Sequence, residues 1–419
     1  MEIKEISPAE YTAFLEGHPQ ASLWQTPMMA QMQKNNGKEV LYLGLEDEGQ
    51  LSGVSLVCLE PAHFGRLHAR SMRGPVMDYA DPAVVAQALE AFKNELKARG
   101  VLYWSLNPYC VYARHTLDGQ VIEGSQQTDL LKGFEQAGAI HRGLVTGIDN
   151  RYEPRWMYVI PTDYPSPLAL LKTFERKCQR SIQRTEDCGV VVRELGREEL
   201  DVLNSLFEKA EQRHGFSWRK DDYNQRLWDA FHEAGAVRFL VAEVSVKAYV
   251  DKLQAELSRK QQEKSETEQK LAAAPSKKMQ NRLRTLEEKL ASLEKHLKEA
   301  QEYLKDGDVL QLAGGIFFVS GPEVLCLMSS YDDKYAYFCG PYALHWNQLK
   351  FCIANHIPRY NLYGVSGEFG DDAEDGGVFA FKRGFGGEVW ELPGDFQLPV
   401  DKTRYKLFQL AKKLKGGSF

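Results

Sequence analysis

The sequence lacks long apolar segments, paired cysteines and complete catalytic motifs. No apolar run approaches the ~18 residues that cross a bilayer, and the first residues have no basic-then-apolar signal pattern. We therefore expect a cytoplasmic protein. The seven cysteines are scattered and include no C-x-x-C pair, which predicts reduced thiols and no zinc site. The sequence has no G-x-S-x-G, H-E-x-x-H or P-loop motif either.

The length of the chain allows several domains. At 419 residues, with an ordinary apolar content of 43%, the body is predicted to fold as two or three globular units. Breaks and composition divide the chain into four parts. We expect a first domain at 1–150, a second at 151–245 and 307–400, an arm at 246–306, and a C-terminal helix at 401–419.

The predicted arm is set by the spacing of its apolar residues. From Met279 to Leu304 they recur at alternating intervals of four and three, which is typical of the seam of a coiled coil. Pro275 lacks the amide that would continue a helix, so it divides the stretch. We predict an antiparallel coiled-coil hairpin with arms of ~28 residues, about 40 Å long. It is inserted between predicted strands at 239–244 and 309–319.

The arm is basic, whereas the rest of the chain is acidic. From Lys247 to Lys305 there are 14 Lys and Arg against 10 Asp and Glu, a net charge of +4, while the whole chain carries −6. A basic arm on an acidic body suits contact with a phosphate backbone. A dimer zipper, a spacer or a solvated charged face explains the same pattern, and these alternatives stay open.

The same order of predicted elements occurs twice. Each half contains a strand, two helices, antiparallel strands, a long helix and a closing strand. Leu51-Ser-Gly-Val54 corresponds to Leu312-Ala-Gly-Gly315, and Gly74-Pro75 corresponds to Gly340-Pro341. The order resembles the Gcn5-related acyltransferase fold. The expected fold class is therefore α/β (α+β), with two tandem domains of this kind and the hairpin inserted in the second.

Neither half has the glycine-rich loop with which that fold normally holds acyl-coenzyme A. The loop places backbone amides around a pyrophosphate at a helix N-terminus, and the segments at 70–75 and 335–341 do not match it. We therefore expect no coenzyme A. Two alternatives remain: a coenzyme A-dependent N-acyltransferase, and a non-catalytic coiled-coil adaptor.

Three polar clusters are candidates for a substrate site. An arginine at a junction between helices can grip a phosphate or carboxylate with its fork of donors. A lysine between bulky rings is held in place rather than moving in solvent. The clusters are 71–78 with Arg73, 214–223 with Arg219, and 360–387 with Tyr363, Phe381 and Lys382.

With these clusters, nearly the whole chain resembles the FemABX peptidyltransferase family. The signatures lie at 73–78, 214–223, 340–343 and 378–387. The resemblance implies two Gcn5-like domains, with a helical arm in the second domain of some members. It implies an aminoacyltransferase that builds the interpeptide bridge of peptidoglycan without a cofactor or metal. Its expected substrates are aminoacyl-tRNA and a precursor, lipid II or UDP-MurNAc-pentapeptide.

The resemblance also implies roles for particular residues. The family's arginine and tyrosine that hold the precursor fall on Arg219 and Tyr223. Its Phe-Lys pair near the reacting centre falls on Phe381 and Lys382. A stem-peptide amine attacks the activated ester of aminoacyl-tRNA, so positioning and a cation near the developing oxyanion are the main requirements. We assign that cation to Lys382 as a hypothesis.

Some family positions are changed in this chain. A lysine of the first domain falls on Gln33, so we take the neighbouring Lys34 as the substrate contact. The aspartate of an Asp-Pro step is Asn107, which removes that carboxylate as a base. Proton transfer through substrate or water is then our hypothesis. Arg73, Asn107 and Tyr363 complete the expected substrate-binding residues.

The expected partners follow from the same resemblance. Arm-bearing members of the family mostly use the lipid-linked precursor, so we expect peripheral contact with the inner membrane face. The tRNA contact is expected at the arm or at the basic helix of 172–184. The amino acid delivered, the bridge position, the choice between lipid-linked and soluble acceptor, and pairing with itself or a homologue stay open.

Overall fold

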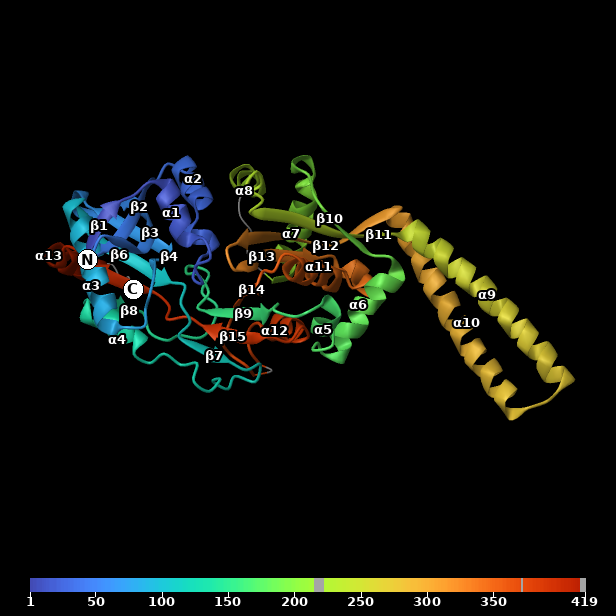
Figure 1. The fold of residues 1–419 in the computed structure, drawn as a ribbon. Helices are drawn as coiled ribbons and strands as arrows, with labels where there is room; N and C mark the ends of the chain where they lie inside the picture. Colours follow the sequence, from blue (N-terminus) through green and yellow to red (C-terminus); the bar gives the residue numbers. More distant parts are fainter. Residues whose placement is uncertain (215–221, 371, 415–419) are drawn as a thin grey trace.

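The computed structural model describes residues 1–214, 222–370 and 372–414, and this part of the chain contains two eight-stranded sheets. Figure 1 shows the sheets side by side in an elongated body, with two long helices projecting from the end that carries the second sheet. The prediction of a mixed α/β fold is confirmed.

The first sheet is built mainly from the N-terminal part of the chain. Helices α1 and α2 lie between its first two strands in sequence, and α3 connects β5 to β6. The strand order is β1 (Glu2–Glu5), β2 (Glu39–Asp47), β3 (Gln50–Pro61), β4 (Leu67–Arg73), β6 (Val101–Pro108), β16 (Phe396–Pro399) and β8 (Ile140–His141), with β5 (Val76–Met77) paired to β3. The helices are α1 (Pro8–Leu15), α2 (Pro27–Asn35), α3 (Pro82–Ala98) and α4 (Leu130–Gln136).

The second sheet is built mainly from the C-terminal part. Its order is β10 (Val191–Glu194), β11 (Val237–Ser245), β12 (Val309–Ser320), β13 (Glu323–Tyr331), β14 (Arg359–Val365), β9 (Trp156–Pro161), β15 (Glu388–Glu391) and β7 (Ala113–His115). Its helices are α5 (Pro167–Leu171), α6 (Arg176–Cys188), α7 (Asp201–His214), α8 (Tyr223–Phe231), α11 (Gly340–Ala354) and α12 (Gly376–Arg383), and α13 (Lys402–Leu414) ends the described chain.

Five strands of each sheet repeat one topology. In the series β1-β2-β3-β4-β6 the first three pairings are antiparallel and the last is parallel. The series β10-β11-β12-β13-β14 has the same directions. Two helices follow the first strand of each series, and a long helix, α3 or α11, precedes the last strand. The predicted internal repeat is therefore present in the element order.

Each sheet also takes a short strand from the other part of the chain. Strand β7 pairs with β15 in the second sheet, and β16 pairs with β6 and β8 in the first. A buried hydrogen bond also links the N-terminal and C-terminal parts of the chain: the Tyr109 hydroxyl donates to a Glu323 carboxylate oxygen at 2.8 Å. Sheet membership therefore departs from the expected ranges 1–150 and 307–400 at these two strands, because both sheets are completed by pairing across the boundary. The four-part division itself stays a prediction.

Local sequence sets where the helices begin. Ser7 and Glu10 accept hydrogen bonds from each other's backbone amides at the start of α1, which is a capping box. The Asp81 carboxylate accepts from the Ala83 amide at 2.8 Å before α3. Proline at the first or second helical position of both helices has no amide of its own, which removes one of the first-turn amides that would lack a partner. These ends fix the helices that lie against the first sheet.

Helices α9 (Val246–Ala273) and α10 (Lys277–Tyr303) form the projecting arm between β11 and β12. The chain turns at 274–276, and the Ser276 hydroxyl caps α10 by accepting from the Met279 amide at 3.3 Å. Apolar residues of the predicted seam are buried between the helices, including Leu286, Leu290 and Leu293. The coiled-coil character of the pair stays a prediction.

The arm is fixed at its root and charged along its length. Tyr249 of α9 packs edge-on against Phe338 of the body at 5.5 Å between ring centres. Ion pairs cross from one helix to the other, such as Arg282 to Glu263 at 2.8 Å. Most of its charged groups therefore face water or each other.

Three further observations concern the described residues as a set. All seven cysteines are unpaired, and six of them are buried. The described residues include no cluster of three or more His, Cys, Asp and Glu side chains placed to hold a metal ion. No helix within the described ranges is long and apolar enough to cross a membrane.

Candidate active site

Two cavities meet where the two halves of the molecule face each other. The first has a volume of about 870 Å³ and the second about 930 Å³. The residues that line both are Asn150, Tyr152, Glu153 and Asp395. Three of these come from the segment that connects the two sheets, so a molecule in one cavity lies within reach of the other.

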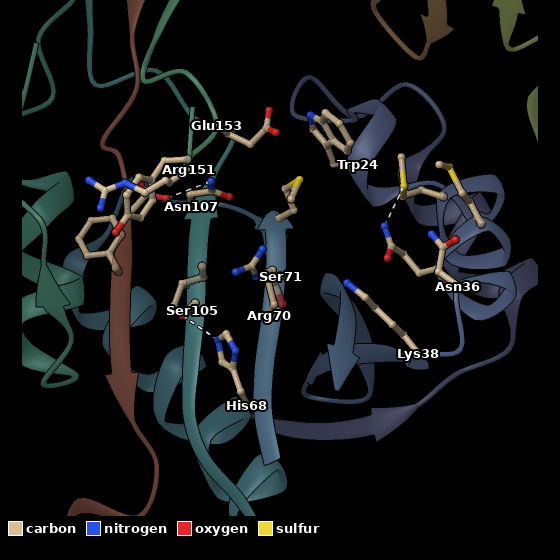
Figure 2. Close-up of a pocket in the computed structure, with 18 of the residues that line it drawn as sticks. Trp24, Asn36, Lys38, His68, Arg70, Ser71, Ser105, Asn107, Arg151 and Glu153 are labelled. Carbon is tan, nitrogen blue, oxygen red and sulfur yellow. Dashed lines mark hydrogen bonds between the residues drawn. The ribbon is translucent and has the colours of Figure 1, made fainter. Parts of the chain in front are cut away.

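The first cavity lies over the ends of two parallel strands. Arg70, Ser71 and Met72 come from β4, and Ser105 and Asn107 come from the neighbouring β6. Parallel strands bring their carboxyl ends to the same edge, where ligands of open α/β sheets usually bind. Figure 2 shows Arg70, Ser71, Ser105 and Asn107 along the two strands. The side chains of Trp24, Asn36 and Lys38 face them across the cavity.

His68 and Tyr103 form a stacked pair at one side of this cavity. Their ring centres are 4.3 Å apart, and the His68 Nε2 lies 2.9 Å from the Ser105 hydroxyl. Burial, together with the nearby Arg70 cation, lowers the pKa of His68 to about 4. The imidazole is therefore neutral near pH 7 and offers a flat, hydrogen-bonding surface rather than a charge.

Basic groups exceed acidic groups along the first cavity. Lys38 is paired with Glu60 at 2.6 Å, and Arg226 with Asp222 at 3.0 Å. Arg70 is exposed and makes no ion pair with any residue that the structure describes. This guanidinium can therefore bind an anion without first breaking an ion pair of its own.

A hydrogen-bond network lies at the junction of the cavities. Arg73 is buried in a left-handed conformation, with φ 55°, and its amide donates to the Asn107 side-chain oxygen at 2.7 Å. Its guanidinium donates to the Pro154 carbonyl at 2.7 Å and lies 3.8 Å from Glu153. The Tyr363 hydroxyl donates to the same Glu153 carboxylate at 2.6 Å. Residues of both halves therefore hold this wall in place.

Asp395 is the second carboxylate shared by both cavities. It accepts from the Asn107 side-chain nitrogen at 3.2 Å, and Arg142 lies 3.9 Å away. Burial raises the pKa of Asp395, and the opposing effect of Arg73 and Arg142 is smaller. A raised pKa makes this carboxylate a better proton acceptor than an exposed aspartate.

The second cavity lies at a gap between β13 and β14. These strands are paired only from Glu323 to Leu325 on the β13 side. Leu327, beyond the last pair, lines the cavity from β13, and Tyr363 and Gly364 line it from β14. Tyr363 has a positive φ of 64°, so the backbone turns sharply beside the gap.

Lys382 of α12 lies behind this gap. Its ammonium donates to the Gly364 carbonyl at 2.7 Å, and the residue is only 7% exposed. Burial lowers the pKa of Lys382 to about 8, against smaller opposing effects from Cys326 and Asp375. The group is therefore mostly charged at pH 7 and close to its titration range.

Aromatic and hydrogen-bonding groups surround Lys382. The neighbouring Phe381 ring lies 5.4 Å from the His345 ring and 5.0 Å from the Tyr342 ring. His345 Nδ1 lies 2.6 Å from the Tyr360 hydroxyl. Burial, and then the Lys382 charge, lower the pKa of His345 to about 3. This packing holds the lysine in one position.

Comparison with known proteins adds to this geometry. A model of the FemAB family matches residues 6–413. The chain belongs to the FemAB family. It is 33% identical to an aminoacyltransferase FemB of Staphylococcus epidermidis, over 99% of both chains. It is 26% identical to an aminoacyltransferase FemA of the same species, over 99% of this chain and 100% of that one.

A solved structure of FemX has the same fold as this FemAB-family chain. The TM-score is 0.79 at 23% identity, with 97% of this chain and 99% of that one covered. The predicted family is therefore confirmed, and so is the prediction that the protein is an aminoacyltransferase.

The structure brings several predicted site residues of this FemAB-family protein together. Tyr223, at the start of α8, and Asn107 line the first cavity, and Tyr363 lines the second. Arg73 lies beneath their junction. Arg219 lies outside the described residues. The substrate-binding roles of all these residues stay predictions.

Three predicted residues lie away from the cavity surfaces. Lys34 is exposed, 5.4 Å from the Tyr42 ring centre, whereas Gln33 lines the first cavity. Successive helical residues point about 100° apart, so a shift of one position moves the side chain off the cavity. Lys382 and Phe381 do not line the second cavity, and Lys382 reaches its wall only through the Gly364 carbonyl.

Sequence reasoning missed the two shared carboxylates and the basic residues of the first cavity. Glu153 precedes Pro154, and Asp395 follows Gly394. A charged residue beside a turn residue is a common surface pattern, so the sequence alone offers no specific signal. Lys38, four residues from Lys34, is the lysine of this region that lines the cavity.

Proposed function

We propose that this FemAB-family protein transfers an amino acid from aminoacyl-tRNA to a stem-peptide amine of a peptidoglycan precursor. The observation that carries the proposal is the pair of cavities joined at Asn150, Tyr152, Glu153 and Asp395. A two-substrate transfer needs separate sites that meet at one point, so that the amine and the ester come together.

The first cavity is our proposed site for the precursor. Its lining is polar and basic, with the exposed Arg70 guanidinium and the flat pair of His68 and Tyr103. Phosphates and carboxylates of a nucleotide-sugar or lipid-linked peptide suit the cations, and sugar rings suit aromatic faces. Tyr223, the expected precursor contact, lies at the same cavity.

The second cavity is our proposed site for the aminoacyl end of the tRNA. Lys382 would stabilise negative charge that develops on the ester carbonyl oxygen. Its ammonium is held at Gly364 rather than in the cavity, so it acts at short range through the strand end or after a small shift towards the ester. No cofactor enters this scheme, because the ester is already activated.

The attacking amine must lose a proton, and we propose Asp395 as its acceptor. This carboxylate lines both cavities and has a raised pKa. Asn107 holds it through a hydrogen bond at 3.2 Å. Asn107, which replaces the family's aspartate, would thus orient the Asp395 carboxylate at the junction of the two cavities. This assignment replaces the hypothesis of proton transfer through substrate or water.

The body of the tRNA would lie along α6 and the arm. Exposed Arg176, Lys177, Arg180 and Arg184 lie on α6, which ends near the root of the arm (Figure 1). Lysine and arginine contacts to phosphates would make binding fall steeply with salt. Pairing with a second copy or a homologue along the arm stays open.

Product mass provides the test. The protein is incubated with a mixture of charged tRNAs and either the soluble or the lipid-linked precursor. We expect the precursor mass to increase by one or more amino acid residues, and the size of the increase identifies the amino acid. A parallel reaction replaces the tRNAs with acyl-coenzyme A. Transfer only from coenzyme A, or no transfer with any charged tRNA, would refute the proposal.

A further inference from the structure

The C-terminal helix α13 presents an uncovered apolar face. Leu407 is 53% exposed and Leu410 is 59% exposed. Residues three apart lie on the same side of a helix, so the two leucines form one strip. Exposed apolar side chains become informative where they gather into one patch beside charged groups, so the surroundings of this strip decide its meaning.

The opposite face of α13 attaches the helix to the body. Tyr405 is buried, and the Phe408 ring lies 4.9 Å from the His63 ring and 5.5 Å from the Tyr103 ring. Phe64, next to His63, is 55% exposed and has a φ of 60°. A third large apolar side chain therefore projects from the loop against which the helix packs.

The charge of this region is opposite to that of the whole protein. Residues 402–419 contain six Lys and Arg and no Asp or Glu, whereas the chain carries −6. The exposed Lys402, Arg404 and Lys406 lie on the described part of the helix, and Asp401 pairs with Arg404 at 2.7 Å. Cations beside an apolar strip are typical of helices that lie in a membrane interface.

We propose that α13 and Phe64 dock on an anionic lipid bilayer, with Leu407, Leu410 and Phe64 entering the headgroup region. The charge complementarity favours a lipid surface. Two leucines and a phenylalanine are also too few for a stable protein interface, which buries roughly 800 Å² on each partner. The apolar strip and the cations supply two kinds of signal, hydrophobic and electrostatic, which together strengthen attachment to a membrane.

The position of α13 beside the first cavity suggests what membrane docking would do for the protein. Tyr103 lines the first cavity and stacks on Phe408, so the cavity wall and the helix share a residue. In Figure 1, α13 lies at the end of the body opposite the arm. A docked protein would receive a lipid-anchored acceptor beside the first cavity and keep the arm away from the bilayer. This use rests on the proposed function, whereas the docking does not.

Vesicle sedimentation tests the docking. The full-length protein is mixed with vesicles of phosphatidylglycerol and phosphatidylcholine or of phosphatidylcholine alone. We expect binding at least about tenfold tighter to the anionic vesicles, weakened by high salt. The double variant Leu407→Glu/Leu410→Glu should bind at least about tenfold more weakly. A matched control is Leu168→Glu, a leucine of α5 that is 60% exposed, and it should bind like the wild type.

Several outcomes would overturn the docking. They are equal binding to both kinds of vesicle, wild-type binding by the double variant, and an equal loss in Leu168→Glu. A dimer that light scattering detects, and that the double variant dissociates, would assign the face to a second copy instead. Unchanged melting temperatures for the variants show that the substitutions leave the fold intact.

A transfer assay separates the docking from the proposed function. With a soluble precursor the double variant should match the wild type. With a precursor embedded in anionic vesicles it should be at least about tenfold slower. Inactivity of the wild type on both precursors, together with intact vesicle binding, would refute the transfer and leave the docking in place.

Discussion

The fourth and fifth strands of each repeated series run parallel in both sheets, but they differ in how far they stay paired. In the first sheet, β4 and β6 are paired at seven positions, up to Arg73 and Pro108. In the second, β13 and β14 are paired at only three, up to Leu325 and Asn361. One topology therefore gives a continuous wall in one half and an opening in the other.

Under the proposed function, this difference would separate precursor binding in the first sheet from reaction in the second. The paired strands carry the polar floor of the first cavity, including Arg70 and Asn107. The parted strands expose the backbone at Gly364, where the buried Lys382 donates its hydrogen bond. Changes at the parted strands are therefore expected to affect the rate of transfer more than the binding of the precursor.

The largest expected effect is that of Lys382→Met, which removes the cation and keeps most of the side-chain volume. We expect kcat to fall about 10²–10³-fold, because one stabilising group at a developing oxyanion is worth that much. KM for the precursor should change little. Steady-state transfer rates measure both quantities. If the variant keeps the wild-type kcat, Lys382 does not take part in the reaction.

Asp395→Asn is expected to lower kcat about a hundredfold through loss of the proposed proton acceptor. The amide can still accept the hydrogen bond from Asn107, so the fold should be kept. Burial raises the pKa of Asp395, and the wild-type rate should fall as the pH drops through that value. The variant should lack this acidic limb. If the limb persists in the variant, Asp395 only positions other groups.

The alkaline limb of the pH profile is a smaller effect and reports on Lys382. Burial lowers its pKa to about 8, so the ammonium is charged below that pH and neutral above it. If the charge stabilises the oxyanion, single-turnover transfer should slow about fivefold between about pH 8 and pH 9. A rate that keeps rising through this range would show that the neutral amine is the active form.

Gly364→Ala tests the gap between β13 and β14, and it is expected to change the transfer rate less than the preceding substitutions do. A Cβ at this position would lie 2.6 Å from two atoms of Pro154, whose carbonyl accepts from Arg73. We expect the free energy of unfolding to fall by about 1–3 kcal/mol, as urea denaturation would measure. Gly377→Ala in α12 is the matched control, since nothing lies within 4 Å of its Cβ. Equal stability of the two variants would show that Pro154 moves aside at no cost in stability, which contradicts the prediction.

Much of the fold could be predicted because its signals are local. Strand alternation, Gly-Pro breaks and the spacing from Met279 to Leu304 are all read within short windows. Strands β7 and β16 are three and four residues long. Their partners are far away in sequence, as in the pairing of His115 with Val389. A short strand whose place is set by a distant partner carries little pattern of its own.

The site could be predicted only in part, for a related reason. Lys382 stands out in sequence because bulky and glycine residues surround it. Glu153 and Asp395 become notable only when the chain brings them to the junction of the cavities. The prediction takes Lys34 as the substrate contact, but its neighbour Gln33 is the residue that lines the cavity. Such an error is invisible without the orientation of the helix.

The exchange of β7 and β16 between the sheets makes the two parts of the chain mutually dependent. A fragment that stops near residue 150 would leave the first sheet without β16, and the remaining fragment would leave the second without β7. Each fragment would expose an unpaired edge and tend to aggregate. A single protease cut in the segment between β8 and β9 should instead give two fragments that remain associated until they are denatured.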